Sequence, residues 1–181
     1  VSLSFPSIDL IINTKLTGSY NLENILAASR IATHFGVEPK AIKESVESYS
    51  PGNSRSQVVD TKKNRVILDA YNANPTSMEV ALTNFASLPS SKNKVAILGE
   101  MLELGKFAET EHFRIANMAI NFDFEQVILI GNLFPKSIPN TMWFETSKEC
   151  TDYLKEHSLE GKIILVKGSR GTKMEVVMDI L

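Results

Sequence analysis

Short apolar runs alternate with helix-like patterns from residue 65 to the end of the chain, and this alternation limits the possible folds most strongly. We predict strands at 65–69, 94–98, 126–130, 142–144 and 162–167, and helices at 75–87, 109–121, 147–157 and 172–180. In the first of these helices, apolar side chains recur at the spacing of one helix face: Met78, Ala81, Leu82 and Phe85. Strands that alternate with helices through short loops favour an α/β domain with a Rossmann-like, doubly wound, mostly parallel sheet.

The first 49 residues follow a different, strand-helix-helix pattern. We predict a strand at 8–17, a helix that starts near Tyr20 and ends at Gly36, and a second helix from Pro39. Residues 1–17 show no partner strand within the chain, so we expect this part to belong to a larger sheet. The stretch "SYSPGNSRSQ" then gathers turn-forming residues, and it predicts a domain boundary between 1–49 and 50–181.

Charge and cysteine content exclude several classes of protein. The formal net charge is −2, and acids and bases are interspersed without a basic block, which argues against a nucleic-acid or membrane-surface partner. The single cysteine, Cys150, excludes an internal disulfide and fits a reducing, cytoplasmic compartment. No apolar run approaches the roughly 20 residues of a membrane span. No CxxC or His-rich spacing predicts a zinc site.

Unusual loops follow four of the predicted strands. They are "DAYNANP" (69–75), "GEMLELG" (99–105), "GN" (131–132) and "KGSRG" (167–171). The carboxyl ends of parallel strands lie at one edge of a sheet, where ligands bind in open α/β folds. We therefore expect one site at this edge, with Asn74 capping the helix that starts at Pro75.

Local pattern leaves two interpretations for each charged loop residue. Asp69 could bind ribose hydroxyls or only accept backbone N–H groups, and Glu100 could approach a substrate or lie in a solvated turn. The stretch 167–175, "KGSRGTKME", resembles an anion cradle at a helix start, with a solvated helix start as the alternative. The chain contains no GxxxxGK[ST] motif, so it carries no P-loop.

For four other residues, the local pattern favours a structural or solvated position over a role in binding or catalysis. His112 is expected to be a surface or capping histidine, and Arg55 a solvated linker arginine. Trp143 and Cys150 are expected to be packing residues.

Five stretches together are similar to the Mur ligase family, the ATP-dependent amide ligases that build the peptidoglycan stem peptide. They are "GSYNLENILAA" (18–28), "NSRSQ" (53–57), "DAYNANPTSM" (69–78), "ILGEMLELG" (97–105) and "KGSRGTKME" (167–175). The resemblance implies a bacterial protein of cell-wall synthesis, with roles in cell shape and division. Within the family, the third and fourth stretches are most similar to the member that adds D-Ala-D-Ala to UDP-N-acetylmuramoyl-tripeptide. The member that adds diaminopimelate or lysine typically has Asp-Asn-Pro-Arg where this chain has "LIGNLFPK".

The resemblance also implies the domain identities. Residues 1–49 would be the C-terminal end of the central ATP-binding domain, and 50–181 the Rossmann-like C-terminal domain. The P-loop, the magnesium-binding acids and the carbamylated lysine of the family are absent. We therefore expect a fragment that needs the missing N-terminal and central domains and is inactive alone, with ATP and Mg²⁺ as cofactors of the whole enzyme.

The family's nucleotide contacts fall on five residues here. The resemblance implies that Asn24 and Asn21 contact adenine, Arg55 the ATP phosphates and Asp69 the ribose, with Tyr71 lining the pocket. One departure is Tyr20, where many relatives carry histidine.

For the acceptor side, the resemblance implies that Asn74, Glu100, Ser169 and Arg170 face the incoming dipeptide, with Arg170 near its carboxylate. The family reaction activates the tripeptide carboxylate as an acyl phosphate, which the dipeptide amine attacks.

Two other functions stay open at this point. One is a related amide ligase of the folylpolyglutamate or cyanophycin type, and the other is a non-catalytic Rossmann-like module that binds a nucleotide or a protein partner.

Overall fold

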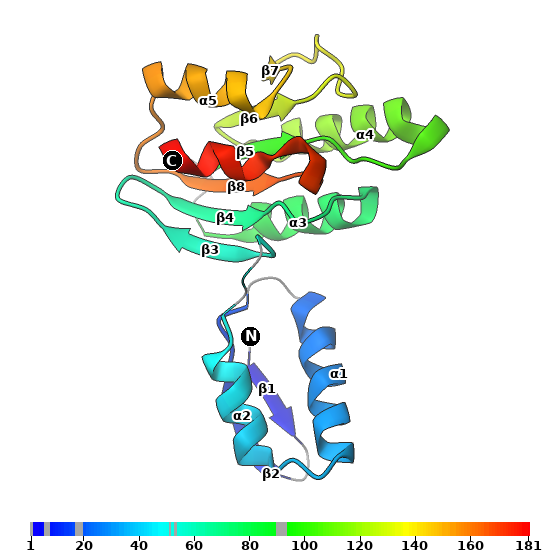
Figure 1. The fold of residues 1–181 in the computed structure, drawn as a ribbon, viewed down its shortest axis with the longest axis vertical. Coiled ribbons are helices and arrows are strands. Elements are labelled where there is room, and N and C mark those ends of the chain that lie inside the picture. The colour runs from blue at the N-terminus through cyan, green and yellow to red at the C-terminus, as the bar shows by residue number, and fades with distance from the viewer. Residues whose placement is uncertain (1, 6–7, 17–19, 51, 53, 90–93) are drawn as a thin grey trace. The chain divides into compact units, whose positions relative to one another are not determined.

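The computed structural model describes residues 2–5, 8–16, 20–50, 52, 54–89 and 94–181 (Figure 1). It divides into two compact units, Val1–Gly52 and Asn53–Leu181. The division falls within the turn-rich stretch that predicted a boundary, a few residues after Tyr49.

The first unit contains a strand hairpin and two helices. Strand β1 (Ser2–Phe5) pairs antiparallel with β2 (Ile8–Asn13), and helices α1 (Tyr20–His34) and α2 (Pro39–Ser48) follow. The expectation that residues 1–17 lack a partner strand is therefore wrong. The predicted strand 8–17 also ends early, because Thr14 starts a turn in which its hydroxyl accepts the Leu16 N–H at 3.0 Å.

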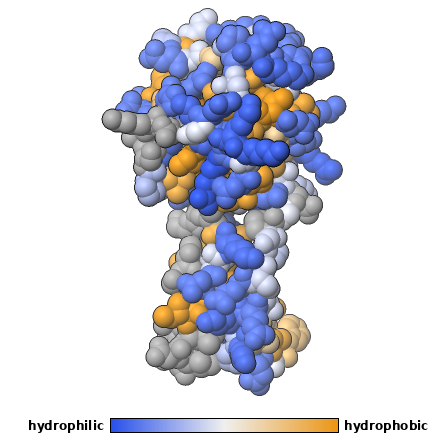
Figure 2. All heavy atoms as spheres, turned by 90° about the vertical axis from the view of Figure 1, so that its left-hand side faces the viewer, coloured by the Kyte–Doolittle hydropathy of each residue, from blue (hydrophilic) through white to orange (hydrophobic). Residues whose placement is uncertain are grey.

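Much apolar surface of the first unit is exposed. Its described core consists of Ile12 and Ile25, with Leu16, Leu22 and Val46 partly buried against them. Large apolar side chains lie outside this core: Ile11, Leu26, Ile31, Phe35, Val37 and Tyr49. Figure 2 shows such apolar surface between the hydrophilic regions of the unit.

The second unit is built on a six-stranded sheet with the order β3-β4-β8-β5-β6-β7. Its strands are β3 (Gln57–Asp60), β4 (Arg65–Asp69), β5 (Lys94–Gly99), β6 (Gln126–Ile130), β7 (Thr141–Phe144) and β8 (Ile163–Lys167). All neighbouring pairs are parallel except β3 with β4. The predicted mostly parallel sheet is confirmed, and β3 is an antiparallel edge strand that the sequence pattern did not indicate.

Helices cover both faces of this sheet (Figure 1). On one face, α3 (Pro75–Ser87) and α4 (Ala108–Ile120) bury Met78, Leu82 and Ile115 against β5 and β6. On the other face, α5 (Ser147–Glu156) and the C-terminal segment bury Cys150 and Val177. The sheet is therefore doubly wound, as predicted.

The last predicted helix, 172–180, is not an α-helix. The chain forms two 3₁₀ segments instead, η3 (Arg170–Thr172) and η4 (Met174–Ile180). They are separated by Lys173, whose φ of 50° is left-handed and interrupts any continuous helix. The neighbouring pair Val176-Val177 also disfavours the α conformation. The stretch 167–175 therefore has no α-helix N-terminus with which to cradle an anion.

Among the described residues, none of the helices combines the length and the apolar character that crossing a membrane requires.

Candidate functional site

Four loops meet at the carboxyl edge of the sheet in the second unit. Strands β4, β8, β5 and β6 are parallel neighbours in that order, so their carboxyl ends lie side by side. The residues that follow these strands include Ala70, Gly168, Glu100 and Gly131. The prediction that the four unusual loops share one edge is confirmed.

Ser169 joins three of these loops. It is 3% exposed, and its backbone N–H donates to the Glu100 carbonyl at 2.9 Å. Its hydroxyl accepts the Leu102 N–H at 3.0 Å and donates to the Ala73 carbonyl at 3.4 Å. A Cβ at Gly168 would lie 2.9 Å from the Gly99 Cα, so only glycine permits this approach of the loops after β8 and β5. The Ser169 side chain is therefore buried between these loops and holds them in place.

Asp69 accepts two hydrogen bonds at the end of β4. One oxygen accepts the Ser56 N–H at 3.1 Å, and the other accepts the Lys167 ammonium at 2.6 Å. The Lys167 side chain is 2% exposed and that of Asp69 18%. Asp69 thus accepts a backbone N–H, the simpler of the two interpretations, and still reaches the surface. Lys167 was not selected from the sequence; the signal available was a lysine that ends the apolar run "IILVK".

Arg55 is held against Tyr71. The guanidinium carbon lies 3.7 Å from the centre of the Tyr71 ring, a cation–π contact. Ser54 and Ser56 on either side have φ of 55° and 45°, and the Ala70 N–H donates to the Ser54 carbonyl at 2.8 Å. Arg55 is exposed, yet it is not the freely solvated linker arginine that the local pattern suggested.

Glu100 bridges the loops after β5 and β6. Its carboxylate accepts the Leu133 N–H at 2.7 Å. A Cβ at Gly131 would collide with the Glu100 side chain, and Gly131 has a φ of 119° that favours glycine. The solvated-turn interpretation of Glu100 is therefore wrong.

His112 is fully buried, so the expectation of a surface or capping histidine is wrong. Its Nε2 accepts the Met101 N–H at 2.9 Å, and its Nδ1 lies 2.7 Å from the Ala108 carbonyl. A backbone N–H only donates and a carbonyl only accepts, so the imidazole is neutral with its proton on Nδ1. Burial lowers the pKa of His112, while the Ala108 carbonyl and Glu100 and Glu111 oppose this shift.

Asn74 and Arg170, the other two residues that the resemblance assigns to the incoming dipeptide, also lie at this edge. The Asn74 side chain accepts the Ser77 N–H at 2.8 Å and caps α3, as predicted. Arg170 is exposed at the start of η3.

Asn21 and Asn24 lie on α1 of the first unit. The Asn24 amide donates to the Asn21 side-chain oxygen at 3.4 Å, and Asn21 is buried.

The two predicted packing residues are packed in the second unit. Cys150 is fully buried, and burial raises the pKa of its thiol to about 12. Trp143 is half-buried, and its indole N–H donates to the Gly131 carbonyl at 2.8 Å.

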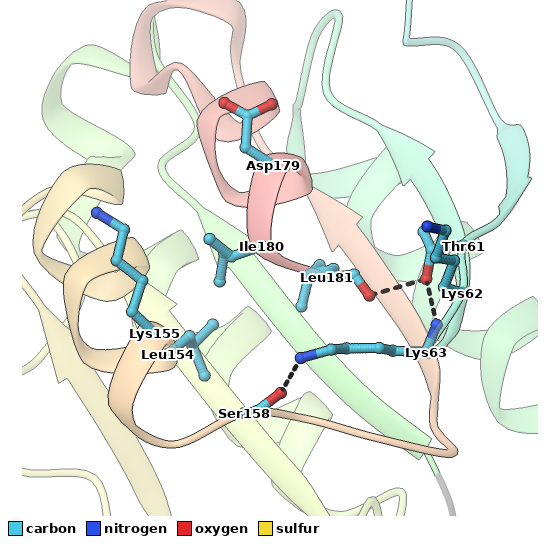
Figure 3. Close-up of a pocket in the computed structure, with 9 residues that line it drawn as sticks. All are labelled: Thr61, Lys62, Lys63, Leu154, Lys155, Ser158, Asp179, Ile180 and Leu181. Carbon is cyan, nitrogen blue, oxygen red and sulfur yellow. Dashed lines mark hydrogen bonds between the residues drawn. The ribbon is translucent and has the colours of Figure 1, made fainter.

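A hollow of about 370 Å³ lies at the opposite, amino edge of the sheet (Figure 3). Three lysines line it, but Lys63 pairs with Glu160 at 3.4 Å and Lys155 with Asp152 at 2.7 Å. The charges of two of these three lysines are thus compensated, and Asp179 adds a negative charge to the lining, so we place no anion site there.

No group of three or more His, Cys, Asp or Glu side chains in the described part of the chain is arranged to hold a metal ion.

Comparison with known proteins identifies relatives for nearly the whole chain. Residues 54–170 match the family described as "Mur ligase, glutamate ligase domain". The UDP-N-acetylmuramoyl-tripeptide--D-alanyl-D-alanine ligase of Bacillus subtilis is 30% identical in an alignment of 179 residues that covers 92% of this chain and 39% of that protein. The ligase of the same name from Buchnera aphidicola (subsp. Baizongia pistaciae) is 34% identical over 97% of this chain and 39% of its own length.

Solved structures agree with these relatives. A crystal structure of MurF from Acinetobacter baumannii has a TM-score of 0.86 and 25% identity, covering 98% of this chain and 41% of that one. MurF ligase from Thermotoga maritima, solved in complex with ADP, has the same fold, with a TM-score of 0.75 at 19% identity over 94% of this chain and 40% of that one. The chain thus spans about two fifths of the length of these relatives.

Proposed function

The chain belongs to the Mur ligase family, and from this premise we propose that it is the C-terminal part of a ligase that adds D-Ala-D-Ala to UDP-N-acetylmuramoyl-tripeptide in peptidoglycan synthesis. The reaction would use ATP and Mg²⁺ in the cytoplasm and would serve cell shape and division. The observation that carries this proposal is that relatives matching more than nine tenths of the chain bear this name.

We propose the nucleotide contacts of each unit by itself. In the proposed enzyme, ATP supplies the phosphoryl group that activates the tripeptide carboxylate. Arg55 has a fixed, exposed guanidinium suited to phosphate oxygens, and the 18% exposed Asp69 carboxylate suits ribose hydroxyls. Tyr71 would line the same pocket, and the amides of Asn21 and Asn24 would pair with adenine when the first unit completes the central ATP-binding domain.

We assign the acceptor side to the loops after β4, β5 and β8. Arg170 is exposed, and among the described residues no ion pair occupies its guanidinium, so it is the residue best suited to the dipeptide carboxylate. Glu100, Ser169 and Asn74 would shape the pocket, because their side chains fix the Leu133, Leu102 and Ser77 backbone positions respectively. Their contribution is positioning of the amine relative to the activated carboxylate.

Mg²⁺ would be held by other parts of the full-length protein, since the described residues form no cluster of ligands for it.

The test is an assay of the full-length protein with ATP, Mg²⁺, UDP-N-acetylmuramoyl-tripeptide and a panel of acceptors. ADP release that depends on D-Ala-D-Ala is expected. Release only with glutamate or diaminopimelate would keep the family and overturn the acceptor, and no release with any acceptor would favour a binding module.

In the same assay, Asp69→Ala is expected to lower kcat/KM for ATP by about a hundredfold, because neither the ribose nor the loop 54–56 would be held in position by the carboxylate. The 181-residue chain alone is expected to release no ADP. Normal ATP use by the Asp69→Ala enzyme would contradict the role given to this carboxylate.

A further inference from the structure

We propose that Lys167 is a positioning residue that holds Arg55 in place through Asp69 and the loop 54–56. The inference rests on the proposed function only for what Arg55 binds, namely the phosphate groups of a nucleotide. The contacts that carry it lie entirely within the second unit.

The first step is the pairing of β4 with β8. Asp69 and Lys167 are register partners at the carboxyl ends of these two parallel strands, so their side chains project side by side. The ammonium and the carboxylate are 2.6 Å apart, and the Lys167 side chain is 2% exposed. A buried ammonium is costly without a partner, so Lys167 requires Asp69 to stay beside it.

The second step leads from Asp69 to the arginine loop. The carboxylate oxygen that does not contact Lys167 accepts the Ser56 N–H at 3.1 Å. The Ser54 carbonyl accepts the Ala70 N–H at 2.8 Å, and this bond holds Ser54 to the same end of β4. Both serines have left-handed φ, a conformation that non-glycine residues keep only when contacts hold it. Arg55 lies between these two anchored residues.

The third step concerns the surface on which Arg55 lies. The Lys167 ammonium is also 3.4 Å from the Asn72 carbonyl, so it contacts both ends of the segment 69–72. This segment carries Tyr71, whose ring lies under the Arg55 guanidinium. One buried lysine therefore supports both the loop that carries Arg55 and the aromatic ring against which it packs.

A control residue lies next to the other end of β8. Lys162, just before β8, is ion-paired with Glu125 at 2.5 Å at the opposite edge of the sheet. Lys162→Met removes a paired lysine without touching the loop 54–56, and it is matched to Lys167→Met in size and in the charge removed.

The first experiment measures amide hydrogen exchange by NMR in the 181-residue chain. In Lys167→Met, we expect the Ser56 amide to exchange roughly tenfold faster than in the wild type, because its acceptor is no longer fixed. The Ile97 amide in β5 should stay protected, which shows that the sheet is intact. Lys167→Gln, which keeps a donor for Asp69, should give a smaller increase, and Lys162→Met should give none. An unchanged Ser56 rate in both Lys167 variants would overturn the inference.

The second experiment is a double-mutant cycle in the full-length protein, with ADP release as the readout. Lys167→Met and Arg55→Ala are each expected to lower kcat by roughly a hundredfold, and the double variant should be little worse than either. Multiplied losses in the double variant would mean that Lys167 does not act through Arg55, and this would overturn the inference. If the wild type releases no ADP, the proposed function fails, while the exchange result still decides whether Lys167 holds the loop.

Discussion

His112 connects α4 to the loop that follows β5, and this connection requires a neutral imidazole. Because burial lowers its pKa, the unfolded chain binds a proton at a higher pH than the folded chain does. Stability should therefore fall as the pH drops through the ordinary histidine pKa of about 6.5. The slope from this one residue has a ceiling of about 1.4 kcal/mol per pH unit while the folded imidazole stays neutral. Urea unfolding at pH 7.5, 6.5 and 5.5 measures it.

The His112→Gln variant serves as the comparison, since it keeps a polar side chain that does not titrate. It should be less stable at pH 7.5 and lose most of the dependence between pH 7.5 and 5.5. His34→Gln, at an exposed position, should retain the wild-type slope. A wild-type slope in the His112→Gln protein would show that other groups cause the acid sensitivity.

The sequence revealed those site residues whose role follows from their near neighbours along the chain. Asp69 ends a strand and Asn74 caps a helix within one short stretch, so local pattern selected them. Lys167 pairs with a residue 98 positions away, and His112, on α4, accepts the Met101 N–H from the loop that follows β5. Nothing in the local pattern records such partners, and both residues were missed or misread.

The capping of α3 decides where the loop 70–74 ends. Asn74 and Ser77 form a reciprocal capping box, in which each side chain accepts the backbone N–H of the other residue. Asn74→Ala is expected to lower the free energy of unfolding by about 1 kcal/mol, and Asn74→Ser, which keeps an oxygen acceptor, by much less. Chemical denaturation of the 181-residue chain measures both. Equal losses in the two variants would show that the side-chain oxygen does not stabilise α3.

Most elements were predictable because their signals are local. The run Val66–Leu68 and the helix stripe starting at Met78 fixed β4 and α3 with the bounds observed. Edge strand β3 has no comparable signal, since its burial is only partial and its pairing with β4 depends on the hairpin that joins them. The prediction of a C-terminal helix was wrong because apolar periodicity encodes neither the left-handed φ of Lys173 nor the weak helix preference of Val176 and Val177.

The two units differ greatly in the core that each can form. The first has a small described core around Ile12 and Ile25, whereas the second has a cluster of buried side chains on each face of its sheet. A unit of about 50 residues buries too little surface to be more than marginally stable alone. We therefore expect the units to unfold separately, the first at a urea midpoint at least about 1 M lower.

Trp143 makes this prediction measurable, because it is the only tryptophan in the chain and lies in the second unit. Its indole donates to the Gly131 carbonyl, so its fluorescence reports unfolding of the sheet there. Far-UV circular dichroism also detects α1 and α2, and should show an earlier transition that fluorescence does not. A chain of residues 53–181 should show coincident transitions by both methods. Coincident transitions in the 181-residue chain would instead mean that the units stabilise each other enough to unfold together.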